Sequence, residues 1–194
     1  MHFAIDKILA LNADEKSPLH ARVDAARIGM AGHSFGGWTT LAVAGEKMPS
    51  AGETLAEPRI RAAIAMSPPI PARREERDTV FATIKIPIFE MTGTLDDSPI
   101  GETKAAERRI AFDKINSPGS CLVIFKDADH MTFAQHLLPR QHAQDEHFHA
   151  LICDASTAFW DGHLRENKAA LDWLERGGFA KTLDGDGTFE IKNP

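Results

Sequence analysis

Residues 32–36, Gly-His-Ser-Phe-Gly, fit the pattern Gly-x-Ser-x-Gly. In this pattern the serine occupies a strained turn from a strand into a helix, which holds its hydroxyl clear of its neighbours for nucleophilic attack. A short apolar run at residues 27–31 precedes the segment, and residues 37–48 have helical composition. These flanks favour a nucleophile at Ser34 over the alternative, a serine that only caps the helix.

A serine hydroxyl is a weak nucleophile until a base takes its proton, so a histidine and an orienting carboxylate should follow. The order expected after this turn is serine, acid, histidine. Asp96 and Asp97 follow one predicted strand, and His130 follows the next one. Because the carboxyl ends of parallel strands meet at one edge of a sheet, these groups should lie near Ser34.

Neighbouring residues offer alternatives for two of these roles. Asp96 is preferred as the acid because it is the first residue after the turn, whereas Asp97 is expected to cap the following helix or brace the loop. Asp129 adjoins His130, but adjacent side chains usually diverge, so Asp129 is expected to hydrogen-bond within its loop. His33 is expected to be a packing residue and not a second base.

Alternating strands and helices must position these groups. Short, continuously apolar runs are typical of strands in a parallel sheet with both faces covered, so the expected fold is α/β, a mostly parallel sheet flanked by helices. The chain is expected to form a single domain over residues 1–194, with a loose tail at residues 184–194 that is rich in glycine and aspartate. The predicted strands are residues 27–31, 60–66, 84–91 and 121–125; the predicted helices are residues 3–11, 37–48, 102–115, 145–160 and 165–176, the last ending at Gly177-Gly178; residues 67–77 and 132–144 are predicted to be irregular loops.

The composition excludes several classes of protein. The chain has 194 residues, 43% of them apolar, which is enough for a real core. A net charge of −6 offers no broad basic surface, so no nucleic-acid partner is expected. No apolar stretch approaches the about 18 residues of a membrane span, and the first residues lack the pattern of an export signal. No membrane partner is therefore expected, and localisation is left open. The two cysteines, Cys121 and Cys153, allow one optional bridge at most.

Histidines and large apolar residues near the predicted site are further candidates for binding a metal or the substrate. Six of the nine histidines fall between residues 130 and 163, and His142 with Glu146 has helical spacing for a metal. No His-Glu-x-x-His is present, so no metal site is expected. Met131 and Ser67 are predicted to contact substrate, since both follow strand ends at the expected edge. Trp38 and Phe133 fit a substrate pocket or core packing equally well.

Several segments resemble α/β-hydrolases, and the nearest branch contains dienelactone hydrolases, platelet-activating-factor acetylhydrolase-like proteins and bacterial polyester hydrolases. Residues 24–37 resemble the elbow region, 92–100 the acid loop, 129–133 the histidine loop, and 157–161 with 170–174 the closing helices. The resemblance runs from about Phe3 to about Arg176. It implies a serine hydrolase that cleaves small-molecule carboxylic esters without a cofactor. It also implies that Ser34 is the nucleophile, Asp96 the acid, His130 the base and the amide of Phe35 an oxyanion donor.

The resemblance also sets up expectations about what precedes the elbow. In that family four or more strands come before it, whereas 33 residues precede Ser34 here, so the chain is expected to form the C-terminal half of an α/β-hydrolase fold. The loop that gives the second oxyanion amide would be absent. The strand at residues 27–31 would become an edge, which either pairs with another copy of the chain or is covered by residues 1–20. The alternative function is therefore a catalytically impaired remnant or a partner-binding domain. A nucleotide-binding module is disfavoured because Gly-x-Gly-x-x-Gly is missing.

Overall fold

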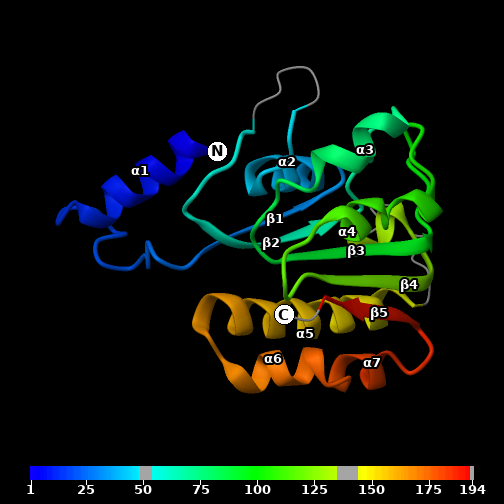
Figure 1. Ribbon diagram of the computed structural model, residues 1–194. Coiled ribbons are helices and arrows are strands. Elements are labelled where there is room, and N and C mark those ends of the chain that lie inside the picture. Colours follow the sequence, from blue (N-terminus) through cyan, green and yellow to red (C-terminus); the bar gives the residue numbers. More distant parts are fainter. Residues whose placement is uncertain (49–53, 135–143, 193–194) are drawn as a thin grey trace.

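A five-stranded sheet forms the centre of the protein in the computed structural model, which describes residues 1–48, 54–134 and 144–192 (Figure 1). The strand order is β1-β2-β3-β4-β5, and the first four strands are parallel, whereas β5 is antiparallel to β4. The fold is therefore α/β, as predicted. The strands are β1 (Ile28–His33), β2 (Ile60–Met66), β3 (Ile88–Leu95), β4 (Cys121–Asp129) and β5 (Gly187–Ile191).

Helices cover both faces of this sheet (Figure 1). The long helix α5 packs with α6 and α7 on one face, and α2, α3 and α4 lie on the other. The helices are α1 (His2–Ala13), α2 (Phe35–Ala44), α3 (Arg74–Val80), α4 (Ile110–Lys114), α5 (Asp145–Arg165), α6 (Lys168–Glu175) and α7 (Gly178–Leu183), with 3₁₀ turns η1 (Ala105–Glu107) and η2 (His130–Phe133).

An aromatic cluster forms the centre of the core on the α5 face. Phe89 of β3 is fully buried, and its ring lies 5.5 Å from Phe159 of α5 and 6.4 Å from Phe179 of α7, centroid to centroid. Phe189 of β5 completes the cluster at 6.0 Å from Phe89. The continuously apolar strands are explained by this arrangement, because alternate residues of β3 enter the core on opposite faces of the sheet.

Helix α1 lies at the β1 end of the sheet (Figure 1). Ile5 is buried there against Val43 and Ile60, whereas Phe3 and Ile8 remain 72% and 43% exposed. In the part of the chain that the structure describes, β1 pairs with β2 alone, so β1 is an edge strand as expected. Pairing of this edge with another copy of the chain stays a prediction, which sedimentation velocity at increasing concentration tests.

Residues 184–194 were expected to be loose, and for residues 187–191 that prediction is wrong. Asp184 and Gly185 both adopt positive φ and turn the chain back, after which β5 pairs with β4. Phe189 and Ile191 pack on the core, and Glu190 forms an ion pair with Arg109 at 3.0 Å. The alternation of apolar and polar residues over this short segment therefore outweighs its glycine-rich and aspartate-rich start.

Other boundaries also differ from the prediction. The helix expected over residues 102–115 is broken into η1 and α4, and the buried Arg108 lies between them. The loop expected over residues 67–77 ends early, since α3 begins at Arg74. The third predicted strand begins later, at Ile88, after Pro87, which has no N–H to donate to a sheet. The predicted loop at residues 132–144, including His142, lies largely outside the described residues.

Both cysteines are free, Cys121 buried and Cys153 exposed. Burial raises the pKa of the Cys121 thiol. Within residues 1–48, 54–134 and 144–192, no helix has the length and apolar character needed to cross a membrane.

Phe89→Ala should destabilise the protein by about 3–5 kcal/mol, because it leaves a cavity at the centre of the aromatic cluster. Ile100→Ala is the matched control, since Ile100 is 94% exposed and its truncation should change stability by less than about 0.5 kcal/mol. Urea unfolding followed by circular dichroism measures both. Equal midpoints for the two variants would contradict the position of Phe89 in the core.

Candidate active site

The turn between β1 and α2 holds Ser34 in a backbone conformation that is rare for a residue with a side chain. Its φ is 57° and its ψ is −119°, and it is the residue immediately before α2. The N–H of Ser34 donates to the carbonyl of Met66 on β2 at 2.9 Å, which fixes the turn to the neighbouring strand. Such a conformation costs free energy and persists only where the surroundings enforce it, as at many active sites.

Two glycines allow this turn to close. A Cβ at Gly32 would lie 2.3 Å from the carbonyl oxygen of Gly36, and a Cβ at Gly37 would lie 2.9 Å from that of Met66. Gly36, in contrast, has nothing within 4 Å of an added Cβ. The close approach therefore requires glycine at positions 32 and 37, whereas position 36 has room for a side chain.

Ser34, His130 and Asp96 lie in a continuous chain of hydrogen bonds. His130 Nε2 lies 2.9 Å from Ser34 Oγ, and His130 Nδ1 lies 2.8 Å from Asp96 Oδ1. Since a carboxylate only accepts, Nδ1 carries the proton toward Asp96, and Nε2 is then free to accept from the serine hydroxyl. His130 is 7% exposed and Asp96 is fully buried. The structure thus brings together the three residues that the sequence predicts as nucleophile, base and acid.

The second oxygen of Asp96 is held by two hydroxyls. Ser67 Oγ donates to Asp96 Oδ2 at 2.5 Å, and Thr92 Oγ1 donates to the same oxygen at 2.8 Å. Ser67 is fully buried, so its side chain braces the acid and is not available to a substrate. The prediction that Ser67 contacts substrate is therefore wrong for its side chain. No signal in the sequence marked this hydroxyl as a partner of Asp96.

Arg108 is a part of this site that the sequence does not reveal. Its side chain is 1% exposed, although arginine is rarely buried without partners. Its Nε donates to the carbonyl of Asp96 at 2.8 Å and lies 3.1 Å from Asp96 Oδ2. Its Nη1 donates to the carbonyls of Ser67 at 2.7 Å and Pro68 at 2.8 Å. One guanidinium therefore joins the loop after β3 to the loop after β2.

The charge of Arg108 also acts on the triad. Burial lowers the pKa of Arg108, and the neighbouring Asp96 opposes that shift, so the group keeps its charge. Its Nη2 lies 3.3 Å from His130 Nδ1. The Nδ1 proton already goes to Asp96, so this contact is a close approach of two donors. The positive charge of Arg108 offsets the negative charge of the buried Asp96 carboxylate, because removing that carboxylate from water would otherwise cost free energy.

The loop that carries His130 is fixed by its neighbours. His33 Nε2 donates to the carbonyl of His130 at 2.9 Å, and His149 Nε2 donates to the carbonyl of Thr132 at 2.7 Å. Burial is the main cause of the lowered pKa of His33, which keeps its ring neutral near pH 7. Asp129 Oδ1 accepts from the N–H groups of Met131 and Thr132 at 2.8 and 3.1 Å. His33 and Asp129 thus have the packing and loop roles expected of them.

Asp97 points away from His130. Its Oδ1 accepts from the backbone N–H of Ala105 at 2.9 Å, and its Oδ2 pairs with Lys104 at 2.9 Å. These bonds hold the start of η1 and, with the Ala105 N–H as the main cause, lower the pKa of Asp97. The preference for Asp96 over Asp97 agrees with this geometry.

The apolar residues that adjoin Ser34 and His130 in the sequence have different surroundings in the structure. Phe35 is the first residue of α2 and is 68% exposed, and its ring lies 5.0 Å from that of Trp38. Because the first N–H groups of a helix have no partner inside it, the Phe35 amide is available as a donor. Met131 is half-buried next to His130. Phe133 packs 6.2 Å from Phe125, which is a core contact.

No group of three or more potential metal ligands occurs among the described residues, which do not include His142.

Comparison with known protein families gives one finding: the family model PETase, described as PET hydrolase-like, matches residues 1–136. The matched part contains Ser34, Asp96 and His130. A comparison with curated proteins found no match.

Gly32→Ala should destabilise the protein by about 1–3 kcal/mol, because its methyl group would meet backbone atoms of Gly36 that cannot easily move. Gly36→Ala should be neutral or slightly stabilising, since position 36 lies in the first turn of α2 and has open space. Thermal unfolding of the two variants measures the difference. A Gly36→Ala protein as unstable as Gly32→Ala would refute the assignment of the close contact to position 32.

Proposed function

The chain belongs to the PET hydrolase-like family of polyester hydrolases in the α/β-hydrolase superfamily, and on that premise we propose that it cleaves carboxylic esters through an acyl-enzyme on Ser34. The observation that carries the proposal is the pair of hydrogen bonds from Ser34 Oγ to His130 Nε2, at 2.9 Å, and from His130 Nδ1 to Asp96 Oδ1, at 2.8 Å. The substrate is a small ester or the ester group of a polymer chain.

In the proposed reaction His130 Nε2 takes the proton of Ser34 as the serine oxygen attacks the ester carbonyl carbon. The tetrahedral intermediate then collapses, the bond to the alcohol oxygen breaks, and the imidazolium gives its proton to the departing alcohol. Water repeats the sequence on the acyl-serine and releases the acid. Asp96 fixes the Nδ1–H tautomer throughout and stabilises the positive imidazolium.

The developing oxyanion needs donors, and the proposed one is the backbone N–H of Phe35. This amide stands at the N-terminus of α2, a helix of ten residues, where the helix dipole also favours negative charge. A single lost donor of this kind typically costs about 10²- to 10³-fold in turnover. Each step uses a hydroxyl, an imidazole, a carboxylate and water, so the proposed reaction calls for no cofactor.

Ser34→Ala should abolish hydrolysis of p-nitrophenyl butyrate, because it removes the hydroxyl that forms the acyl intermediate. The measurement is release of p-nitrophenol by wild type and variant at equal concentration. A serine-directed phosphonate should label the wild-type protein at Ser34 and leave the variant unlabelled, as judged by intact mass. Equal turnover by both proteins would end the proposal. Absent turnover together with absent labelling would favour the impaired or partner-binding alternative.

Asp96→Asn should lower kcat by on the order of 10³- to 10⁴-fold, since the imidazole loses the group that fixes its tautomer. Asp97→Asn is the matched control, because Asp97 is one residue away, exposed, and bonded to Lys104 and Ala105. Its kcat should stay within a few-fold of wild type. A larger loss of kcat in Asp97→Asn than in Asp96→Asn would identify Asp97, and not Asp96, as the acid of the triad.

Arg108→Met should lower kcat/KM by about 100-fold, because the loss of its donors lets Asp96 move relative to His130. Arg108→Lys keeps the charge without the forked geometry, so it should recover part of the loss. Arg109→Met is the control: Arg109 is adjacent but partly exposed, and it bonds Asp113 and Glu190 away from the triad. Ester hydrolysis by the three variants, with their melting temperatures, separates lost activity from lost stability. Arg108→Met with wild-type kcat/KM would exclude a positioning role.

A further inference from the structure

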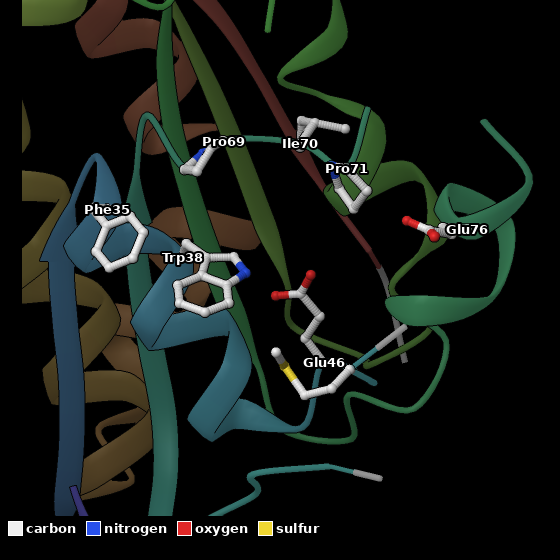
Figure 2. A pocket seen from close by; sticks show the side chains of 8 residues that line it. Phe35, Trp38, Glu46, Pro69, Ile70, Pro71 and Glu76 are labelled. Carbon is white, nitrogen blue, oxygen red and sulfur yellow. The ribbon is translucent and has the colours of Figure 1, made fainter. Parts of the chain in front are cut away.

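A pocket of about 290 Å³ lies beside the elbow, between α2 and the segment that follows β2 (Figure 2). Its walls are mostly apolar, formed by Phe35 and Trp38 of α2 and by Pro69, Ile70 and Pro71. Clefts of this size and apolar character, with a few polar groups inside, are typical of sites for small organic groups.

Glu46 places a carboxyl group inside this apolar surface. It is 2% exposed, and its Oε2 accepts no hydrogen bond from any residue that the structure describes. Figure 2 shows the carboxyl group between the indole of Trp38 and the ring of Pro71. Buried carboxyl oxygens are nearly always hydrogen-bonded, because leaving one without a partner is costly. Since no described residue donates to Glu46 Oε2, this oxygen is open to a donor on a bound ligand.

The pocket is placed to receive part of a substrate bound at Ser34. Phe35, which lines the pocket, directly follows Ser34 in the chain. On the other side, Pro69 follows two residues after Ser67, whose hydroxyl holds Asp96. One wall of the pocket therefore adjoins the nucleophile, and the opposite wall adjoins the residue that holds Asp96.

The charges around the pocket determine which chemical group of a ligand can bind next to Glu46. Glu46 and Glu76 are its only charged lining residues among those described, and the Glu76 carboxylate lies 3.5 Å from Arg73 at the surface. Glu90, buried in β3, adds a further acidic group near Glu46. Burial raises the pKa of Glu46 to about 8, so the group is mostly an uncharged acid at pH 7. A carboxylate on the ligand would find no cationic partner among the described lining residues, whereas a hydroxyl can donate to Glu46 in either of its protonation states.

We propose that this pocket binds the acyl chain of the substrate and that Glu46 accepts a hydrogen bond from a hydroxyl at the end of that chain. The proposal rests on the proposed function and adds a substrate class, esters of hydroxy acids with an apolar chain. The six-carbon chain of a 6-hydroxyhexanoyl group is the probe for this class.

The test compares p-nitrophenyl 6-hydroxyhexanoate, hexanoate and the adipate monoester, which share one leaving group. Wild type should favour the hydroxy ester over hexanoate by about tenfold in kcat/KM, the effect of one hydrogen bond to a buried acid. Glu46→Leu should invert that ratio, and Glu46→Gln should keep part of it. Glu75→Gln, an exposed neighbour on α3, should leave it as in wild type. Equal ratios in wild type and Glu46→Leu, or a preference for the adipate monoester, would overturn the proposal.

A binding measurement separates this proposal from the proposed function. The Ser34→Ala protein is titrated with methyl 6-hydroxyhexanoate and methyl hexanoate, and the indole fluorescence of Trp38 is followed, with Trp38→Phe as the blank. Tighter binding of the hydroxy ester, lost in the double variant with Glu46→Leu, supports the pocket even if no ester is turned over. Equal binding of the two esters would refute the pocket even if the triad is active.

The pH dependence of stability provides a second check on the buried acid. The pKa of Glu46 is raised from 4.5 to about 8, so folding opposes its ionisation and the protein loses stability as the pH rises through this window. Glu46→Gln removes this loss and should melt higher than wild type at pH 9, with a smaller difference at pH 5. Glu76 and Glu90 remain in both proteins, but Glu46→Gln also removes a charge that raises the pKa of Glu90, so the difference reports on Glu46 together with its effect on Glu90. Identical melting curves at pH 9 would show that the Glu46 carboxyl is not buried without a partner.

Discussion

The burial of one carboxylate, that of Asp96, constrains the rest of the site. A charge removed from water must be compensated by hydrogen bonds and opposite charge, or the group would take up a proton. Here the compensation comes from Ser67 at the end of β2, Thr92 within β3, His130 at the start of η2 and Arg108 between η1 and α4. These four partners come from different elements around the sheet edge, so the buried carboxylate ties those elements together.

The same edge uses one local arrangement twice. Ser34 and Ser67 follow adjacent strands, both have positive φ, and each donates its backbone N–H to a carbonyl of the next strand, Met66 or Met91, at 2.9 Å. The two hydroxyls then meet opposite ends of the triad, one at the imidazole and the other at the carboxylate. The strained backbone at two successive strand ends therefore positions two hydroxyls that unstrained turns would direct elsewhere.

Much of the site could be predicted because its signals are local. The elbow of Ser34, the strand ends before Asp96 and His130, and the continuous apolar runs depend only on nearby sequence and on the rule that parallel strands share an edge. Arg108 was missed because arginine is usually expected at the surface, although helical spacing puts it on the same face as the buried Ala111, Phe112 and Ile115. Glu46 was missed because a glutamate in the last turn of a predicted helix, residues 37–48, is expected to face water. Packing against distant segments buries both residues, and spacing along one segment does not record that packing.

The C-terminal strand has a consequence for the handling of this gene. A coding region cut after Leu183, where the composition turns to glycine and aspartate, would remove β5. The ring of Phe189, which packs on the core, and the backbone groups that pair with β4 would be lost with it. Phe89 and Phe179 would then face water, and the sheet would have unsatisfied amides along both margins. The short last segment therefore closes the β4 edge of the sheet, and a protein truncated before it should aggregate.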